Sequence, residues 1–341
     1  MSGEPRLPKL PPEERDDIHA LSEASYPGPV LTPGDVAGGA PLEEAAAILD
    51  PGHGVPLPGR RFRLGPAWRA PLGIIGAVIA IAWITVAVLA PVVAPADPLA
   101  EAFARLQPPG PDNWLGTDAN GRDVFSRLIF GARTTIPLSL LLVGMSLVIG
   151  SVLGAIAGFF GKWVDEAIMR ITDLVMAFPT TVLAMVVAAS LGASLLNAVF
   201  AALVVSWPSY ARVTRSLVVG LRTSNYVTAG RLLGVSPWTS LARDIAPNVI
   251  GPVLVLASLD VGTATLLLSG LSFLGLGAKP PTPEWGSMIS ASIGQFDYWW
   301  LGVFPGLAIL SVVLAFNFMG DTLRDAFDPR SSGIVTKGNP T

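Results

Sequence analysis

The sequence predicts an all-α membrane protein with six transmembrane helices. Of its 341 residues 51% are hydrophobic and only 14% are charged, whereas a soluble domain has about 25% charged residues. Six apolar segments, most of them close to the ~20 residues that a bilayer-spanning helix needs, follow one another between residues 71 and 319. Lysine and arginine gather in alternate connecting segments, which is the asymmetry that orients membrane proteins.

Residues 1–68 precede the first apolar segment and are rich in proline and glycine, with scattered acidic residues. Such a composition cannot bury enough apolar surface to fold, so it predicts a disordered cytoplasmic tail. A short helix at Leu42–Leu49 and a role as a regulatory or partner-binding arm are alternatives. Because no apolar run occurs before Pro71, we expect no cleaved signal peptide and an uncleaved first anchor.

The first span is predicted at residues 71–94, which as a helix would cover ~36 Å against a hydrocarbon core of ~30 Å. Arg60, Arg61, Arg63 and Arg69 directly precede it and predict a cytoplasmic N-terminus. The other spans are predicted at Thr135–Phe160, Ile171–Leu191, Leu195–Ala211, Val249–Gly275 and Trp299–Met319. Six spans place both termini inside, with 17 of the 22 basic residues on that side.

The segment 96–134 is predicted to be an extracytoplasmic loop. Gly116 and Gly121 suggest a turn, and Val124–Phe130 suggests an amphipathic helix at the membrane surface. The loop carries four arginines, for which Asp112, Asp118 and Asp123 are candidate partners.

The core, residues 135–320, holds five spans. Gly150, Gly154 and Gly158 lie four residues apart on one face of the second span, a spacing that lets helix backbones approach closely. We expect packing within the chain rather than against a partner. A cytoplasmic turn, Gly161–Pro179, follows. Its Gly161-Lys162 pair lacks the remaining residues of a phosphate-binding loop, so we expect no ATP site on this chain.

Two further spans carry polar residues that we single out as candidates for a pathway or a hinge: Pro208, Tyr210, Asp260 and Thr263. A proline inside the fourth span can kink it. Acids within membranes usually face a cavity or pair internally, so Asp260 has either a substrate-path role or a hydrogen-bonded structural role. Residues 321–341 are expected to form a cytoplasmic C-terminal tail.

The loop 222–248 between the fourth and fifth spans has the pattern of a compact helical corner. Ser224 is a candidate cap of a first helix and Gly234 is suited to the left-handed turn that ends it. Ser236 and Pro237 then look like the cap and first residue of a second helix, which Pro247 is expected to stop. Such a corner presents side chains in fixed directions, which suits docking into a groove on a partner protein.

The same loop carries a family resemblance. Its pattern of Tyr226, Ala229, Arg231, Gly234, Pro247 and Asn248 resembles the coupling-helix signature of permease subunits of ATP-binding-cassette (ABC) importers, from which Thr228, Asp244 and Ala246 depart. The strings LGTD and GRDVFSRLIFGAR in the first loop are similar to the C-type subunit of the dipeptide, oligopeptide and nickel branch. The resemblance runs from Leu72 to Arg330.

This resemblance implies a type I ABC importer (MetI-like) permease fold with a cytoplasmic coupling helix, in a bacterial inner membrane. It implies a non-catalytic subunit that binds no cofactor and works with a homologous B-type permease, two ABC ATPases that hold ATP and Mg²⁺, and an extracytoplasmic substrate-binding protein or lipoprotein. Di- and oligopeptides are the expected substrates; nickel complexes, glutathione-like peptides and other small solutes are alternatives. The expected coupling residues are Tyr226, Ala229, Gly230, Arg231, Gly234, Ser236, Arg243 and Pro247.

Composition narrows the remaining possibilities. A net charge of −3 gives no reason to expect a nucleic-acid partner, and the chain has no cysteine for thiolate chemistry. Both histidines, His19 and His53, lie in the N-terminal tail, so we expect no metal site in the core. An ion-driven transporter or channel is a rival, although such proteins usually carry several ionisable groups at the midplane and only Asp260 qualifies. A membrane-anchored assembly or signalling subunit is a second rival.

Overall fold

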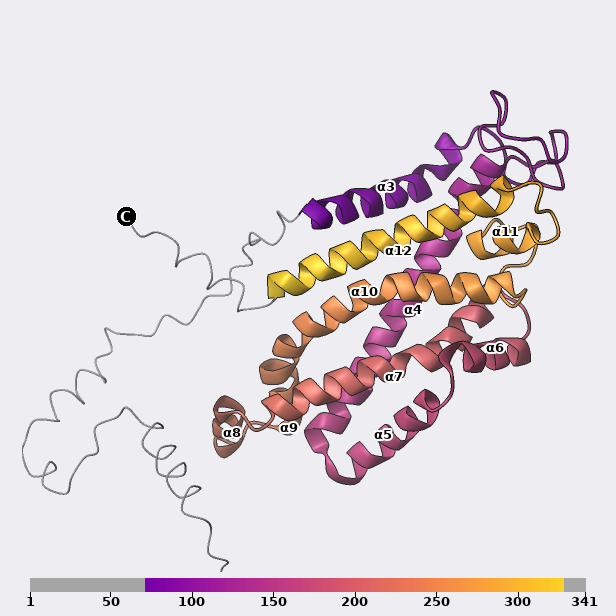
Figure 1. Ribbon diagram of the computed structural model, residues 1–341. Helices are drawn as coiled ribbons and strands as arrows, with labels where there is room; N and C mark the ends of the chain where they lie inside the picture. Colours follow the sequence, from indigo (N-terminus) through magenta and orange to yellow (C-terminus); the bar gives the residue numbers. More distant parts are fainter. Residues whose placement is uncertain (1–70, 328–341) are drawn as a thin grey trace, which may run out of the picture. The chain divides into compact units, whose positions relative to one another are not determined.

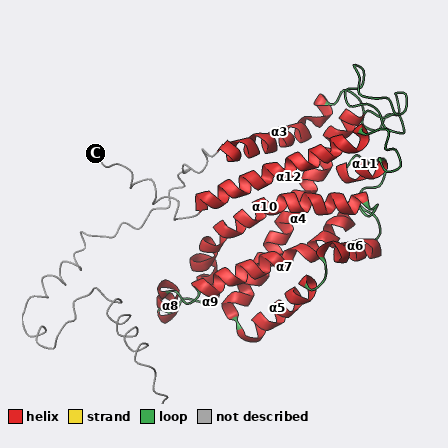
Figure 2. Ribbon diagram, viewed as in Figure 1, coloured by secondary structure: helices red, strands yellow, loops and turns green. Residues whose placement is uncertain are grey.

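The computed structural model describes residues 71–327, and over this range the chain is helical without a β-strand (Figure 2). This confirms the all-α prediction for the described residues. The tail predicted at 1–68, with its possible helix, and most of the tail predicted at 321–341 lie outside them. Four helical stretches are long and apolar enough to cross a membrane: α3 (Pro71–Val93), α4 (Val124–Phe160), the stretch Pro237–Phe273 and α12 (Trp300–Phe327). A fifth is added if one bent pair counts as a span, so the six-helix count stays a prediction.

Helix α3 matches the predicted first span to within one residue and lies beside α12 (Figure 1). Small residues allow this contact, because a Cβ atom on Gly76 would meet the carbonyl oxygen of Ala315 at 2.7 Å. The Trp83 indole nitrogen donates a hydrogen bond of 2.8 Å to the Ser311 hydroxyl. A polar contact of this kind supplements van der Waals packing, which drives helix association in lipid.

Helix α4 joins two elements that the sequence suggested were separate. The surface helix expected at Val124–Phe130 and the second span are one helix of 37 residues, so that part of the 96–134 loop prediction is wrong. Gly131 lies inside the helix and allows close packing there, since a Cβ atom on it would lie 2.6 Å from the Trp285 ring. Pro137 also lies inside the helix without ending it.

The glycine face of α4 packs against α7 (Leu195–Leu221), the most extensive helix pair of the described chain. Added Cβ atoms on Gly150, Gly154 and Gly158 would each come closer than 3 Å to backbone of α7. The partner residues on α7, Trp207, Ala211 and Arg215, are themselves four residues apart. The prediction that these glycines serve close packing within the chain is confirmed.

The third predicted span is not continuous. Helices α5 (Lys162–Met176) and α6 (Thr180–Leu191) meet at 90°, so the helix expected over Ile171–Leu191 is broken. Pro179 explains the break, because its ring disfavours a helical conformation at Phe178 and it has no N–H to continue the ladder. The fourth predicted span lies within α7, which continues to Leu221 and keeps Pro208 buried inside it.

Helix α10 (Ala246–Phe273) lies between α7 and α12, with α4 crossing behind it (Figure 1). The short helix α11 (Trp285–Ala291) packs against α10 and α12 near the loop that precedes α4. Buried apolar side chains from α4, α7, α10 and α12 form one continuous core. The candidate coupling loop, residues 222–248, lies at one end of the helix bundle, and loop 94–123 with α11 lies at the other end (Figure 1).

Candidate functional site

The corner of the candidate coupling loop is formed by the end of α8 (Asn225–Leu232). Gly234 has φ of +81°, a conformation that glycine adopts without strain. Its N–H donates to the Arg231 carbonyl (3.1 Å), and the Val235 N–H donates to the Gly230 carbonyl (3.0 Å). This pair of bonds is the Schellman ending of a helix. The predicted left-handed glycine turn is confirmed, and backbone bonds fix its direction.

The second helix of the corner starts as predicted but does not stop where expected. Ser236 accepts a hydrogen bond from the Thr239 N–H (3.3 Å) and Pro237 occupies the first position of α9 (Pro237–Thr239). A π-helical turn, Ser240–Ile245, follows and leads directly into α10. The prediction that Pro247 ends this helix is therefore wrong.

The π-helical turn explains how Pro247 is accommodated. The Ala246 N–H donates to the Leu241 carbonyl, five residues back instead of four. Pro247 then falls in the first turn of α10, where proline is tolerated. As a result the chain runs from Pro237 to Phe273 without a break in its helical backbone, and the corner is continuous with a membrane-length helix.

The loop rests on the end of α4. The Arg222 guanidinium donates a hydrogen bond to the Gly158 carbonyl (2.7 Å). Gly158 lies in the last turn of α4, where the negative end of the helix dipole stabilises a positive charge. The Arg231 guanidinium lies 5.2 Å from the centre of the Phe159 ring, and the Trp238 and Phe160 rings are 5.0 Å apart. Each arm of the corner is thus anchored by an aromatic contact.

The opposite surface of the corner is apolar and exposed. Leu232 and Leu233 are each 85% exposed, and Tyr226 is exposed as well. Between them only Val227 turns inward and is fully buried. A cluster of exposed large apolar side chains at the tip of a rigid corner marks an interaction surface.

Most of the predicted coupling residues are exposed. Exposed are Tyr226, Ala229, Arg231, Gly234, Ser236, Arg243 and Pro247, while Gly230 is half-buried under Val235. Sequence reasoning did not find the anchors Arg222, Phe159, Phe160 and Trp238. The sequence did hold a signal for three of them: Arg222 directly follows one apolar segment, and Phe159 and Phe160 end another.

Two ion pairs join α7, the helix that precedes the candidate coupling loop, to α5. Arg215 of α7 forms a bidentate ion pair with Asp165, whose Nη2–Oδ2 distance is 2.6 Å, and Arg212 lies 2.7 Å from Asp173. The first pair is partly buried and the second is exposed, so the first contributes more to holding α5 on α7.

The structure brings two of the predicted pathway residues together. The Tyr210 hydroxyl donates a hydrogen bond of 2.9 Å to an Asp260 carboxylate oxygen, linking α7 to the middle of α10. Tyr210 is fully buried with Pro208 one half-turn away, whereas Asp260 is half-buried and Thr263 is exposed on α10. The hydrogen bond supports the structural role, and the exposed Thr263 beside it leaves the substrate-path role open.

The other end of the core is held by buried polar contacts. Asp123 accepts hydrogen bonds from the Ser126 N–H (2.8 Å) and from the Asn113 amide (3.0 Å), so it caps α4. Asp118, as expected, pairs with arginine, at 2.8 Å from Arg122 and 3.5 Å from Arg127. The prediction that Asp123 pairs with an arginine is not what the structure shows.

Glu284 completes this end by capping α11. Its carboxylate accepts hydrogen bonds from the N–H groups of Gly286 (2.9 Å) and Ser287 (2.8 Å). Burial raises the pKa of Glu284, and the hydrogen bonds that favour the charged form oppose this only in part. Among residues 71–327 no three histidine, cysteine or acidic side chains lie close enough together to hold a metal ion.

A bundle of membrane-length helices with an exposed apolar corner at one end has the features of a membrane protein subunit. Comparison with known proteins is more specific. Residues 150–333, more than half of the chain, match the family model described as binding-protein-dependent transport system inner membrane component. The chain belongs to this family of permease components of binding-protein-dependent ABC transporters.

Individual relatives agree. The chain is 39% identical over 300 residues to the dipeptide transport system permease protein DppC of Alkalihalophilus pseudofirmus, covering 84% of this chain and 98% of the relative. It is 40% identical over 266 residues to the probable D,D-dipeptide transport system permease protein of Escherichia coli K12, covering 77% and 89%. A glutathione transport system permease protein of another Escherichia coli strain is 38% identical over 279 residues, covering 80% and 90%. The resemblance to C-type permeases of the peptide branch is confirmed.

Proposed function

We propose that this chain forms, with a homologous B-type permease, the membrane pathway of an ATP-driven importer for di- and oligopeptides. The observation that carries the proposal is the corner at Gly234, which is exposed, apolar at its tip and continuous with α10. The relatives named for dipeptide transport support the choice of substrate. The relative named for glutathione keeps a tripeptide as the alternative, with nickel complexes and other small solutes behind it.

In this proposal the candidate coupling loop docks against the pair of ABC ATPases that power the transporter. Those partners bind ATP and Mg²⁺, and this chain contributes the docking surface. Leu232 and Leu233 enter a groove on the ATPase, where their burial supplies affinity. Closure of the ATPases then displaces the loop. Such a displacement shifts the pathway only if the loop contacts the two ATPase states differently.

The helical backbone gives this displacement a route to the middle of the membrane. Because the π-helical turn joins the corner to α10 without a break, movement at residues 232–238 carries α10 with it. The Tyr210–Asp260 hydrogen bond links α10 to α7 near the middle of both helices, and α7 packs on α4 through the glycine face. The three helices would then move together between outward-facing and inward-facing states.

The proposed topology follows from this arrangement. The candidate coupling loop and both termini lie in the cytoplasm, six spans cross the inner membrane, and loop 94–123 faces the extracytoplasmic binding protein. The broken pair α5 and α6 and the helix α7 supply the third and fourth spans. The excess of basic residues on the cytoplasmic side supports this orientation.

Replacing Gly234 by valine tests the proposal. A β-branched residue at φ +81° is strained by about 1–2 kcal/mol and would change the direction of the corner. We expect the reconstituted transporter to lose peptide uptake and peptide-stimulated ATP hydrolysis while the subunit still inserts and assembles. Gly220→Val is the matched control, because Gly220 is exposed, helical and in open space.

Uptake at the wild-type rate by the Gly234→Val transporter would remove the main support for the lever. Uptake that persists without ATP and collapses with the proton gradient would contradict the ATP-driven mechanism itself. An accessibility assay at Leu233 in sealed vesicles separately tests whether the corner faces the cytoplasm.

A further inference from the structure

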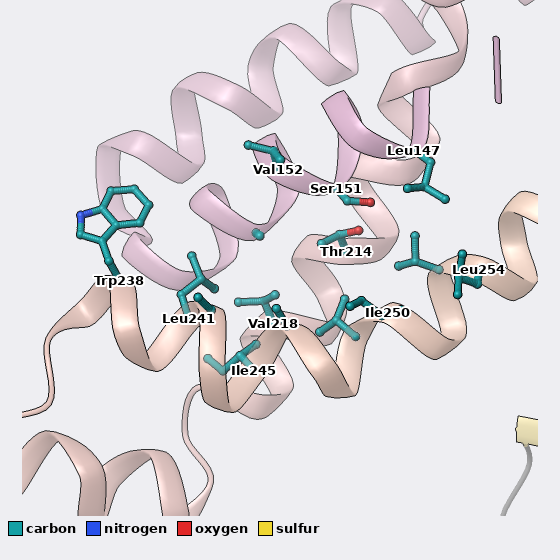
Figure 3. Close-up of a pocket in the computed structure, with 15 residues that line it drawn as sticks. Leu147, Ser151, Val152, Thr214, Val218, Trp238, Leu241, Ile245, Ile250 and Leu254 are labelled. Carbon is teal, nitrogen blue, oxygen red and sulfur yellow. The ribbon is translucent and has the colours of Figure 1, made fainter. Parts of the chain in front are cut away.

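An apolar groove of about 280 Å³ lies where the candidate coupling loop enters the helix bundle (Figure 3). Helix α4 contributes one wall through Leu147 and Val152, α7 contributes Thr214 and Val218, and the π-helical turn with α10 closes it. Its surface is almost entirely carbon. The polar side chains of the wall, Ser151 and Thr214, carry no charge.

The groove has a covered floor and an open rim. Thr214, Val218 and Ile245 are buried at its floor. Val152, Ile250 and Leu254 line the groove and are each about half exposed, at 53%, 55% and 44%. The groove is therefore open along the faces of α4 and α10 that are uncovered in this chain, and both helices are long and apolar enough to cross a membrane.

The groove is long enough to cross one leaflet of a bilayer. The lining runs along the helix from Trp238, next to the start of the membrane-length stretch, to Leu254. Sixteen steps at 1.5 Å give ~24 Å, more than the ~15 Å depth of one leaflet of a ~30 Å hydrocarbon core. Trp238 lines the end of the groove nearest the loop, and the exposed Arg243 directly follows the lining residue Ala242 in the π-helical turn. Tryptophan and basic residues are typical of the headgroup boundary.

We propose that this groove seats one acyl chain of an anionic phospholipid, with the phosphate of its headgroup at Arg243. A zwitterionic peptide suits it poorly, because the lining holds no charged side chain to pair with either end of the peptide. An acyl chain needs no polar partner and enters from the surrounding lipid through the rim. The positive charge of Arg243 favours an anionic headgroup over a zwitterionic one.

This site would connect membrane lipid to the joint of the candidate coupling loop. The same cavity touches α4, α7 and the π-helical turn through Val152, Val218 and Leu241. An acyl chain in it keeps the turn in contact with both walls, whereas an empty groove leaves the turn without support on that side. Lipid composition then becomes a determinant of how firmly the loop is joined to the bundle.

Photolabelling of the assembled transporter tests the proposal. The full-length chain, purified with its associated subunits, is placed in nanodiscs that contain phosphatidylglycerol with a diazirine in its acyl chain, and adducts are mapped by mass spectrometry. We expect adducts on the floor residues Thr214, Val218 and Ile245, which lipid passing over the surface cannot reach. Val88, exposed on α3, reports labelling by ordinary surrounding lipid.

A matched pair of variants on α4 separates a seated chain from passing lipid. Val152→Trp fills the rim and should abolish the floor adducts while leaving the adduct on Val88. Val148→Trp, an equally exposed position one turn away that does not line the groove, should leave both. Floor residues that stay unlabelled in the assembled transporter, as they would if a partner subunit filled the groove, overturn the proposal.

The headgroup assignment has its own measurement. Floor labelling by phosphatidylglycerol should exceed labelling by a phosphatidylcholine with the same acyl chain, and Arg243→Gln should remove that difference. Equal labelling by the two lipids in the wild-type protein overturns the role of Arg243. Because labelling is read without transport, the result does not depend on whether the proposed peptide pathway is correct.

Discussion

The two ends of the helix bundle are stabilised in different ways. At the end formed by loop 94–123 and α11, buried carboxylates accept hydrogen bonds from within the chain, as at Asp123 and Glu284. At the end formed by the candidate coupling loop, backbone bonds fix the corner while large apolar side chains such as Leu232 and Leu233 stay exposed. One end is held by buried polar contacts, and the other by backbone hydrogen bonds beneath exposed leucines.

This difference suggests a division of tasks within one subunit. Buried polar groups are costly without partners, so hydrogen bonds such as those of Asp123 and Glu284 favour one arrangement of the chain. An exposed apolar tip costs the free subunit some solubility and is useful only if it is covered in the assembly. The first end should therefore be sensitive to substitution in its stability, and the second end in its activity.

The largest effect on stability should come from the glycine face that joins the two ends. Gly154→Leu forces a side chain against the backbone of Ala211, which cannot move aside without separating α4 from α7. We expect a loss of about 3 kcal/mol or more in the free energy of unfolding, measured by thermal unfolding of the purified subunit in detergent. Gly144→Leu, on the same helix in open space, should change little; equal losses in the two variants would contradict the packing.

The buried polar end should show the next largest effect. Asp123→Ala removes the α4 cap and leaves donors of Ser126 and Asn113 without their acceptor. Loss of a cap and of buried hydrogen bonds should cost about 2–3 kcal/mol, seen as a lower unfolding temperature. Asp112→Ala, an exposed acid of the same loop, is the control. If the two substitutions proved equally mild, the contrast between the two ends would be lost.

Local signals in the sequence predicted the features that depend on neighbours in the chain. The corner at Gly234 and Ser236 follows from residue types that prefer those backbone conformations, and the structure has both. The glycine spacing of α4 predicted close packing, because a repeat of four residues defines one helix face. These features require no knowledge of distant segments.

Features that depend on distant segments were not predictable. Pro247 was expected to end a helix and does not, because a π-helical turn accommodates it, whereas Pro179 breaks a span that was predicted to be continuous. Tyr210 and Asp260 were singled out separately, and only the fold shows that they bond across fifty residues. The anchoring of Arg222 on Gly158 likewise joins two helices that no periodicity relates.

A smaller effect is expected where the candidate coupling loop is anchored. Arg222→Gln loses a charged hydrogen bond to the Gly158 carbonyl at the end of α4. We expect about 1–2 kcal/mol of destabilisation, with hydrogen exchange rising in α8 more than in α11. Arg170→Gln removes an exposed ion pair with Glu166 and should be nearly neutral. Exchange that rises equally at both ends after Arg222→Gln would contradict a local anchor.

The smallest effect on stability, and the largest on activity, should come from the exposed tip. Replacing Leu232 and Leu233 by serine removes side chains that contact little in the free subunit, so the free energy of unfolding should change by less than about 0.5 kcal/mol. A leucine that becomes buried against a partner contributes about 1.5–3 kcal/mol, so pull-down of the ATPases and ATP-dependent uptake should both be lost. Leu99→Ser, an exposed leucine at the opposite end, should leave ATPase binding intact. Retained ATPase binding after the double substitution would mean that the tip is not the docking surface, and the exposure of the two leucines would then need another explanation.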